Sequence, residues 1–153
     1  MLSIQISDIK DFMSHLLSKD TFDHFYFIEA SIKMGVSYQI QGRINEGFYD
    51  TSVEQTLNRE FCYWKEIRHR IFDIIKGKRL PLSCKIVLGL SKQSISYLIA
   101  HNNSSFREED IEGIYVNILY DPKNLLITTG ISYKNFSLDK SLEYAFDEYL
   151  VKF

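Results

Sequence analysis

Two pairs of alternating segments constrain the fold more than any other feature of the sequence. The first pair spans residues 26–34 and 36–42, with Gly35 between them, and the second pair lies on either side of the turn at residues 121–124. In each segment apolar side chains alternate with polar ones. An apolar face beside a polar face is typical of antiparallel strands that cover a core on one side only. The sequence therefore predicts two β-hairpins.

Shorter patterns predict a strand and a helix before each hairpin. Residues 2–6 alternate like a short strand, and residues 83–90 form an apolar run of strand length. Apolar residues at helical spacing follow each strand, and Ser7 and Ser91 stand where an N-cap oxygen is expected. A final helix is predicted to begin at Ser137 or Asp139.

The longest apolar stripe predicts a helix that connects the two halves, over residues 52–77. It begins at Ser52 or Glu54 and ends at Lys76, because Gly77 and the nearby Pro81 suit a helix C-terminus.

Arg68 breaks this stripe, since helical geometry points it into the middle of the apolar face. Two explanations are open. The guanidinium lies in an ion pair with Glu60, Glu29 or another carboxylate, or it anchors an anionic ligand.

The order strand, helix, strand, strand occurs twice, which indicates an α+β fold of duplicated βαββ units. The first pseudo-repeat covers residues 1–50 and the second covers residues 82–153, joined by the long helix. We expect antiparallel sheets with helices on one face. A chain of 153 residues is expected to form one domain, 1–153, that buries about 70% of the surface of its unfolded chain.

Charge is distributed unevenly although the net charge is only −2. Residues 1–64 hold five basic and nine acidic groups, residues 65–92 hold eight and two, and residues 93–153 hold five and nine. Either the basic middle packs against the acidic flanks, or it forms a basic surface for an anionic partner.

The candidate anion-binding residues all lie in this basic middle. Cations at a helix end and in the following turn can hold phosphate groups, and such binding weakens with salt. The same positions also suit cations because of the helix dipole. The candidates are Lys65, Arg68, Arg70, Lys76, Lys78 and Arg79.

No motif predicts catalysis, a metal or a cofactor. The four histidines are scattered without zinc-ligand spacing, and no Gly-rich phosphate loop is present. The two cysteines, Cys62 and Cys84, suit a reducing compartment, and the first residues do not form a signal peptide, so we expect a cytoplasmic protein. No apolar run approaches the ~20 residues that cross a bilayer, so no membrane partner is expected.

The repeated layout resembles a domain of the DNA sliding-clamp fold. Ile6-Ser7 corresponds to Leu90-Ser91, and the strand ending at Met34 corresponds to the strand ending at Tyr120. The resemblance implies two units related by a pseudo-twofold axis, with helices covering one face of the sheets. A clamp-like ring would require oligomerisation.

The chain also resembles a family of short, uncharacterised bacterial proteins. The segments that carry this resemblance are residues 6–13, 22–25, 64–68, 76–82 and 138–143, and the match runs nearly from end to end. It implies a domain of unknown function, so it supplies no activity.

Three functional hypotheses follow from the sequence. The leading one is a non-enzymatic interaction domain whose basic central segment contacts an anionic partner such as nucleic acid. The second is an enzyme or sensor that binds a small phosphorylated ligand, with Arg68 as the anion anchor. The third is a structural homo-oligomer formed through an exposed strand edge.

Overall fold

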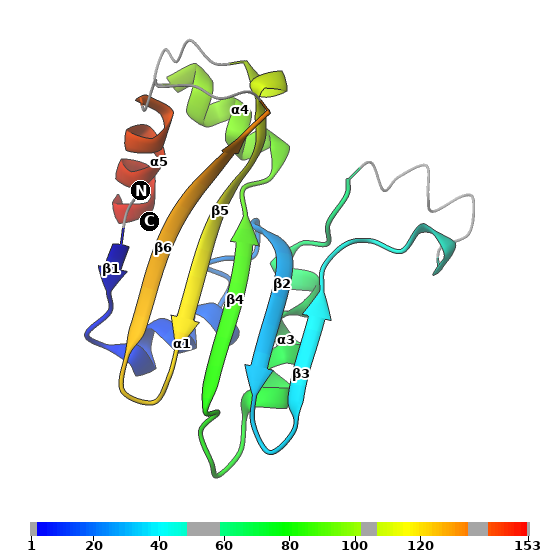
Figure 1. The fold of residues 1–153 in the computed structure, drawn as a ribbon, viewed down its shortest axis with the longest axis vertical. Helices are drawn as coiled ribbons and strands as arrows, with labels where there is room; N and C mark the ends of the chain where they lie inside the picture. The colour runs from blue at the N-terminus through cyan, green and yellow to red at the C-terminus, as the bar shows by residue number, and fades with distance from the viewer. Residues whose placement is uncertain (1–2, 49–58, 102–106, 135–140, 153) are drawn as a thin grey trace.

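A six-stranded antiparallel sheet with the strand order β1-β6-β5-β4-β2-β3 forms the centre of the computed structural model (Figure 1). The structure describes residues 3–48, 59–101, 107–134 and 141–152. The strands are β1 (Ser3–Gln5), β2 (Tyr26–Lys33), β3 (Ser37–Gln41), β4 (Ser83–Gly89), β5 (Ile111–Tyr120) and β6 (Leu125–Tyr133). The helices of the described residues are α1 (Ile9–Leu17), α3 (Trp64–Ile75), α4 (Lys92–His101) and α5 (Ser141–Lys152), with short 3-10 turns η1 (Glu46–Phe48) and η2 (Glu108–Asp110).

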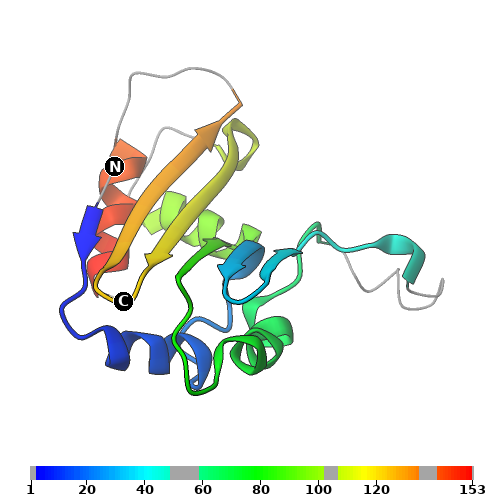
Figure 2. The ribbon, with the colours of Figure 1, turned by 60° about the horizontal axis from the view of Figure 1, so that its bottom comes forward.

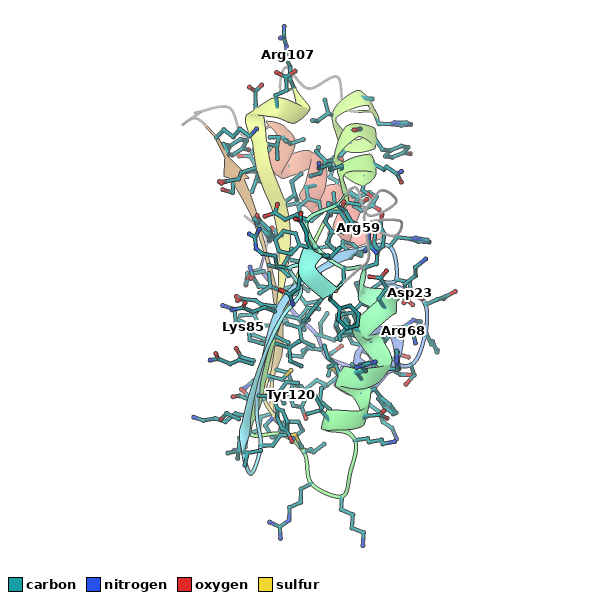
Figure 3. All side chains as sticks on the ribbon, turned by 90° about the vertical axis from the view of Figure 1, so that its right-hand side faces the viewer. Asp23, Arg59, Arg68, Lys85, Arg107 and Tyr120 are labelled. Atoms are coloured by element: carbon teal, nitrogen blue, oxygen red, sulfur yellow. The ribbon has the colours of Figure 1, made fainter. Side chains whose placement is uncertain are left out.

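All four helices lie on one face of this sheet, which leaves the opposite face open to solvent (Figure 3). α1 and α3 pack side by side at the end where β2 finishes (Figure 2), and α4 packs with α5 towards the other end. The core fills the space between these helices and the sheet. It includes the fully buried Trp64 and Phe27, whose ring centroids lie 5.7 Å apart.

Both predicted hairpins are confirmed. β2 pairs with β3, and β5 pairs with β6, each antiparallel. Alternate residues of β5 face the helices and are buried, including Ile114, Val116 and Ile118, as period-two patterning requires. The α+β class is therefore confirmed, and so is the antiparallel pairing.

The duplicated, clamp-like arrangement is not confirmed. A twofold relation between the halves would place β1 and β4 in equivalent positions of the sheet. Instead, β1 is an edge strand that pairs only with β6, whereas β4 is a central strand between β2 and β5. The similar order of elements along the chain thus does not carry over to similar positions in space.

The connecting helix begins later than the sequence predicts, at Trp64. Of the predicted first part, residues 52–58 lie outside the described residues. Residues 59–63 are not helical, since Phe61 and Tyr63 form antiparallel bridges with Arg43 and Tyr26. Phe61, which the sequence places in the apolar stripe of the predicted helix, thus belongs to this extended segment. The predicted end is confirmed, with Lys76 as the C-cap and Gly77 at φ +149°, a conformation that favours glycine.

The extended segment needs a glycine beside it. The backbone N–H of Cys62 donates to the Gly42 carbonyl, and that of Phe27 donates to the Cys62 carbonyl. A Cβ atom on Gly42 would lie 1.8 Å from the Phe27 carbonyl oxygen, so any larger residue would force the backbones apart.

One predicted helix cap is confirmed and one is wrong. At α4, the backbone N–H of Ser94 donates to Ser91 Oγ at 3.2 Å, as expected. At α1, Asp8 rather than Ser7 is the cap, because its carboxylate accepts from the Asp11 N–H at 3.0 Å. The predicted start of the last helix at Ser137 or Asp139 lies outside the described residues, where the structure gives α5 from Ser141.

Candidate anion-binding surface

The loop between α3 and β4 carries two of the predicted cations to the end of the sheet where β2 finishes. Lys78 and Arg79 are exposed in this loop. Its last residue is fixed to the sheet, because the Leu82 N–H donates to the Lys33 carbonyl at 2.8 Å. Lys76 lies at the base of the loop and pairs with Asp73 at 2.9 Å, with both side chains about 60% exposed. Such an exposed pair contributes little.

Strand pairing adds two lysines that the sequence did not assign to the site. Lys33 is opposite Ser83, and Lys85 is opposite Ser31. Both lysines are exposed, and Lys85 points away from the helices, on the open face (Figure 3). Diagonal neighbours on one face of antiparallel strands lie about 7–8 Å apart, so the two ammonium groups are close enough to hold one anionic segment.

We call Lys33, Lys78, Arg79 and Lys85 the basic end. Within the described part of the chain, no carboxylate lies within ion-pair distance of these four cations. Among the described residues these four cations therefore form no ion pair, although the exposed Glu29, opposite Val87, is a diagonal neighbour of Lys85 on the same face.

A groove of about 550 Å³ lies on the open face at the basic end. Lys33 and Lys85 line it, together with hydroxyl and amide side chains of Ser31, Ser37, Gln39, Ser83 and Asn124. The one carboxylate in the lining, Asp121, already accepts from the backbone N–H groups of Lys123 and Asn124, at 2.8 Å each. The groove thus combines two cations and neutral donors with one carboxylate, which backbone N–H groups already bind.

Apolar side chains border the same end. Val36, Leu80 and Leu82 are 64%, 67% and 65% exposed, respectively. These three large apolar side chains are thus exposed at the same end of the sheet as the cations.

Arg68 belongs to the structural framework and not to the basic end. Its Nε donates to Asp23 Oδ1 at 2.9 Å, and an Nη donates to Oδ2 at 3.2 Å (Figure 3). The side chains are only 22% and 14% exposed. Of the two explanations that the sequence left open, the structure shows the ion pair, with a carboxylate other than Glu60 or Glu29. Both guanidinium edges that would face a ligand are engaged.

The remaining predicted cations lie elsewhere on α3. Lys65 is in the first turn, with Nζ 5.8 Å from the centroid of the Tyr63 ring. The rise of an α-helix places it about 16 Å from Lys76. Arg70 is exposed between them. Lys78 and Arg79 thus lie in the loop that is bonded to the sheet at Lys33, whereas Lys65 and Arg70 lie apart from it on α3.

A second group of charges surrounds the start of α3, and here Arg59 is paired. Arg59 donates two hydrogen bonds to the Glu66 carboxylate, and its guanidinium lies 4.5 Å from the Tyr63 ring centroid. Glu66 also accepts from the Tyr63 N–H at 2.9 Å, which caps the helix. We call Arg59, Tyr63 and Glu66 the capping network.

The capping network controls the ionisation of Glu66. Burial raises the pKa of this carboxyl, but the hydrogen bonds from Arg59 and from the Tyr63 N–H outweigh burial, so the pKa lies below its ordinary value. The carboxylate is thus held charged and is not suited to act as a general acid.

The cysteines are not activated nucleophiles. Burial raises the pKa of the Cys62 thiol to about 11 and that of Cys84 to about 12. Both therefore remain protonated at neutral pH. Among the described residues, no cluster of three His, Cys, Asp or Glu side chains could hold a metal ion.

These features define an α+β domain with one open sheet face and an unpaired basic end. The chain belongs to the family of unknown function DUF5721, whose model matches residues 15–153. β1 and the first part of α1 precede that match. No curated protein and no solved structure matches the chain. In the described residues, no helix is both long and apolar enough to cross a membrane.

Sequence reasoning missed Lys33 and Lys85 as site residues, although a signal was present. Lys33 lies on the polar face of its predicted strand, and Lys85 alternates with the apolar Cys84 and Ile86. What the sequence lacks is the β2–β4 register, which joins segments that are far apart in the chain.

Proposed function

We propose that the protein is a non-enzymatic interaction domain that binds nucleic acid through the basic end. One observation carries the proposal. Four exposed cations lie on β2, on β4 and in the loop before β4, whose last residue is bonded to Lys33, and none of the four forms an ion pair within the described residues. A phosphate backbone supplies the charges that this surface lacks.

The groove favours a nucleic acid over a simple anion. Phosphate and sugar oxygens accept hydrogen bonds from Ser, Asn and Gln side chains as well as from cations. Ser31, Ser83 and Gln39 offer such groups between and beside the two lysines. The groove also lies on the sheet face that the helices leave uncovered (Figure 3), where an extended chain could bind.

The test is fluorescence anisotropy with a labelled single-stranded oligonucleotide over a range of salt concentrations. Four phosphate contacts predict a slope of about −3 for log affinity against log salt concentration. Reversing two charges with Lys78→Glu and Arg79→Glu should weaken binding at least about tenfold and reduce the slope by about half. Lys33→Glu with Lys85→Glu should do the same.

The matched control reverses two exposed lysines away from the basic end, Lys19→Glu with Lys134→Glu. It changes the net charge equally and should leave most of the affinity. If the control double variant weakens binding as much as the double variants of the basic end do, the effect is one of net charge and the basic end is not the site. Binding that is indifferent to salt would also reject the proposal.

A second candidate partner is an acidic protein segment, which Val36, Leu80 and Leu82 favour. A nucleic acid backbone has no use for three exposed aliphatic side chains, whereas a peptide with acidic and apolar residues would cover them. Leu80→Ser with Leu82→Ser distinguishes the two partners. It should leave oligonucleotide affinity unchanged but weaken binding of an alternating Glu/Leu peptide.

A further inference from the structure

Two adjoining cavities lie on the helix side of the sheet, on the face opposite the groove of the basic end. The first is about 400 Å³ and is bordered by the start of α3, the start of α4 and α5. The second is about 390 Å³ and lies along α4. They share Gln93, Ser94 and Tyr149, so they form one continuous depression, which we call the helix-side groove. Its size falls in the range of small-molecule sites.

One end of the helix-side groove carries positive charge. Lys65 and His24 line the first cavity, and among the described residues no carboxylate lines either cavity. The nearest acidic residue in sequence to Lys65 is Glu66, whose carboxylate is already bound by Arg59 and by the Tyr63 N–H. An anion at this end would therefore meet an ammonium group that Glu66 does not neutralise.

The helix start beside this end is already capped and does not itself form the site. The Ser94 N–H donates to Ser91 Oγ at 3.2 Å. The groups that remain to face a ligand are side chains, namely Thr21, Gln93 and Ser94 together with Lys65 and His24.

The other end of the helix-side groove is aromatic. Tyr97 lines the second cavity, is 54% exposed, and stacks on His101 with a centroid distance of 3.8 Å. Tyr97 follows Gln93 by four residues, so both lie on the same face of α4, about one turn apart. The Tyr97–His101 pair presents a rigid flat surface on which a planar ring can stack.

We infer that the helix-side groove binds a nucleoside phosphate, with the phosphate at Lys65 and His24 and the base on Tyr97. The groove matches the three parts of such a ligand in order. The cationic end suits the phosphate, the neutral hydrogen-bond donors in the middle suit the sugar, and the aromatic end, one helical turn further along α4, suits the base. This inference goes beyond binding of nucleic acid at the basic end, because it uses other residues on the other side of the sheet.

The experiment is isothermal titration with adenosine 5′-monophosphate, adenosine and inorganic phosphate as three separate probes. The monophosphate should bind at least about tenfold more tightly than either fragment. Lys65→Ala should weaken the monophosphate and inorganic phosphate at least about fivefold but leave adenosine unchanged. Tyr97→Ala should weaken the monophosphate and adenosine but leave inorganic phosphate unchanged.

Matched controls remove the same side chains from other exposed positions, with Lys10→Ala on α1 and Tyr144→Ala on α5. Neither residue lines the helix-side groove, and both variants should bind the monophosphate as the unchanged protein does. Because the side chains replaced in the two test variants and the two controls are all exposed, circular dichroism should show an intact fold in each variant.

The results also separate this site from the basic end. Lys78→Glu with Arg79→Glu should leave monophosphate affinity unchanged. If that double variant abolishes monophosphate binding while Lys65→Ala and Tyr97→Ala do not, the ligand sits at the basic end and the inference is overturned. Equal binding of the monophosphate and its two fragments would overturn it as well.

Discussion

Basic side chains occur both at the basic end and around the start of α3. Those of the basic end form no ion pair among the described residues, whereas the arginines around the start of α3 are bound to carboxylates. At the start of α3, Arg59 is bound to Glu66, and one turn later Arg68 is bound to Asp23. At the basic end, Lys78 and Arg79 project from a loop without a carboxylate among the described residues. Cations from one stretch of sequence thus divide into a paired group and an unpaired group.

This difference shows why local charge alone does not identify a binding surface. Arg68 and Arg79 are both part of the basic middle of the sequence, but only Arg68 reaches a partner across the fold, in the turn before β2. A paired and partly buried cation stabilises the fold. An unpaired and exposed one contributes little to stability and is available to a partner.

The largest effect is expected from breaking the paired group at Asp23. Asp23→Ala leaves the Arg68 guanidinium partly buried without its carboxylate, so the free energy of unfolding should fall by about 3 kcal/mol. Urea denaturation measures the change. Asp73→Ala, which removes the exposed partner of Lys76, is the matched control and should change stability by less than about 0.5 kcal/mol. Equal losses in the two variants would mean that the two ion pairs are equivalent.

A smaller effect is expected from Glu66→Gln, and it should depend on pH. The pKa of Glu66 is lower in the folded protein than its ordinary value of about 4.3, so the charged carboxylate stabilises the fold above that pH. The stabilisation is lost as pH falls through the folded pKa. Because the side chain is 40% exposed, we expect only about 1 kcal/mol.

Urea denaturation of both proteins between pH 3 and pH 7 measures this dependence. The difference between them should be constant above about pH 5 and should shrink towards pH 3. A difference that grows on acidification would show that Glu66 is held in its protonated form.

The smallest effect, with the opposite sign, is expected at the basic end. Lys33→Gln removes one of two like charges at diagonal positions of neighbouring strands, so it should stabilise the fold by about 0.3 kcal/mol at low salt. At 0.5 M salt the gain should disappear, because charges at this separation are then screened. Thermal denaturation with Lys134→Gln as the control tests this. A loss of stability would reveal a partner for Lys33 and remove the contrast between the two groups.

Local signals predicted most of the fold. The alternation in residues 26–34 and the turn at residues 121–124 specify hairpins without reference to the rest of the chain. Ser91 caps its helix, and Gly77 ends another, because both act on their nearest neighbours. Even the anomaly at Arg68 was visible, because helical spacing shows which side of the helix a residue occupies.

Features that depend on contacts between distant segments were not predictable. The predicted start of α3 was wrong because Phe61 fits the apolar stripe of a helix as well as it fits an extended segment. Only its bridge with Arg43 keeps it extended. Only two of the four residues of the basic end were predicted, because Lys33 and Lys85 belong to it through the β2–β4 register. The helix-side groove lies between α3, α4 and α5. The spacing of residues along the sequence does not predict how these helices are placed relative to one another.

The pairing of β1 with β6 has a consequence for how the chain folds during synthesis. Gln5 Nε2 donates to Asn124 Oδ1 at 3.1 Å, a contact between residues separated by 119 positions. β1 therefore lacks its partner until the residues around Asn124, 119 positions later, have been synthesised. Closing so long a loop is slow, so the sheet gains its N-terminal edge last. During that interval the β6 edge is exposed, and a second chain can pair there in place of β1.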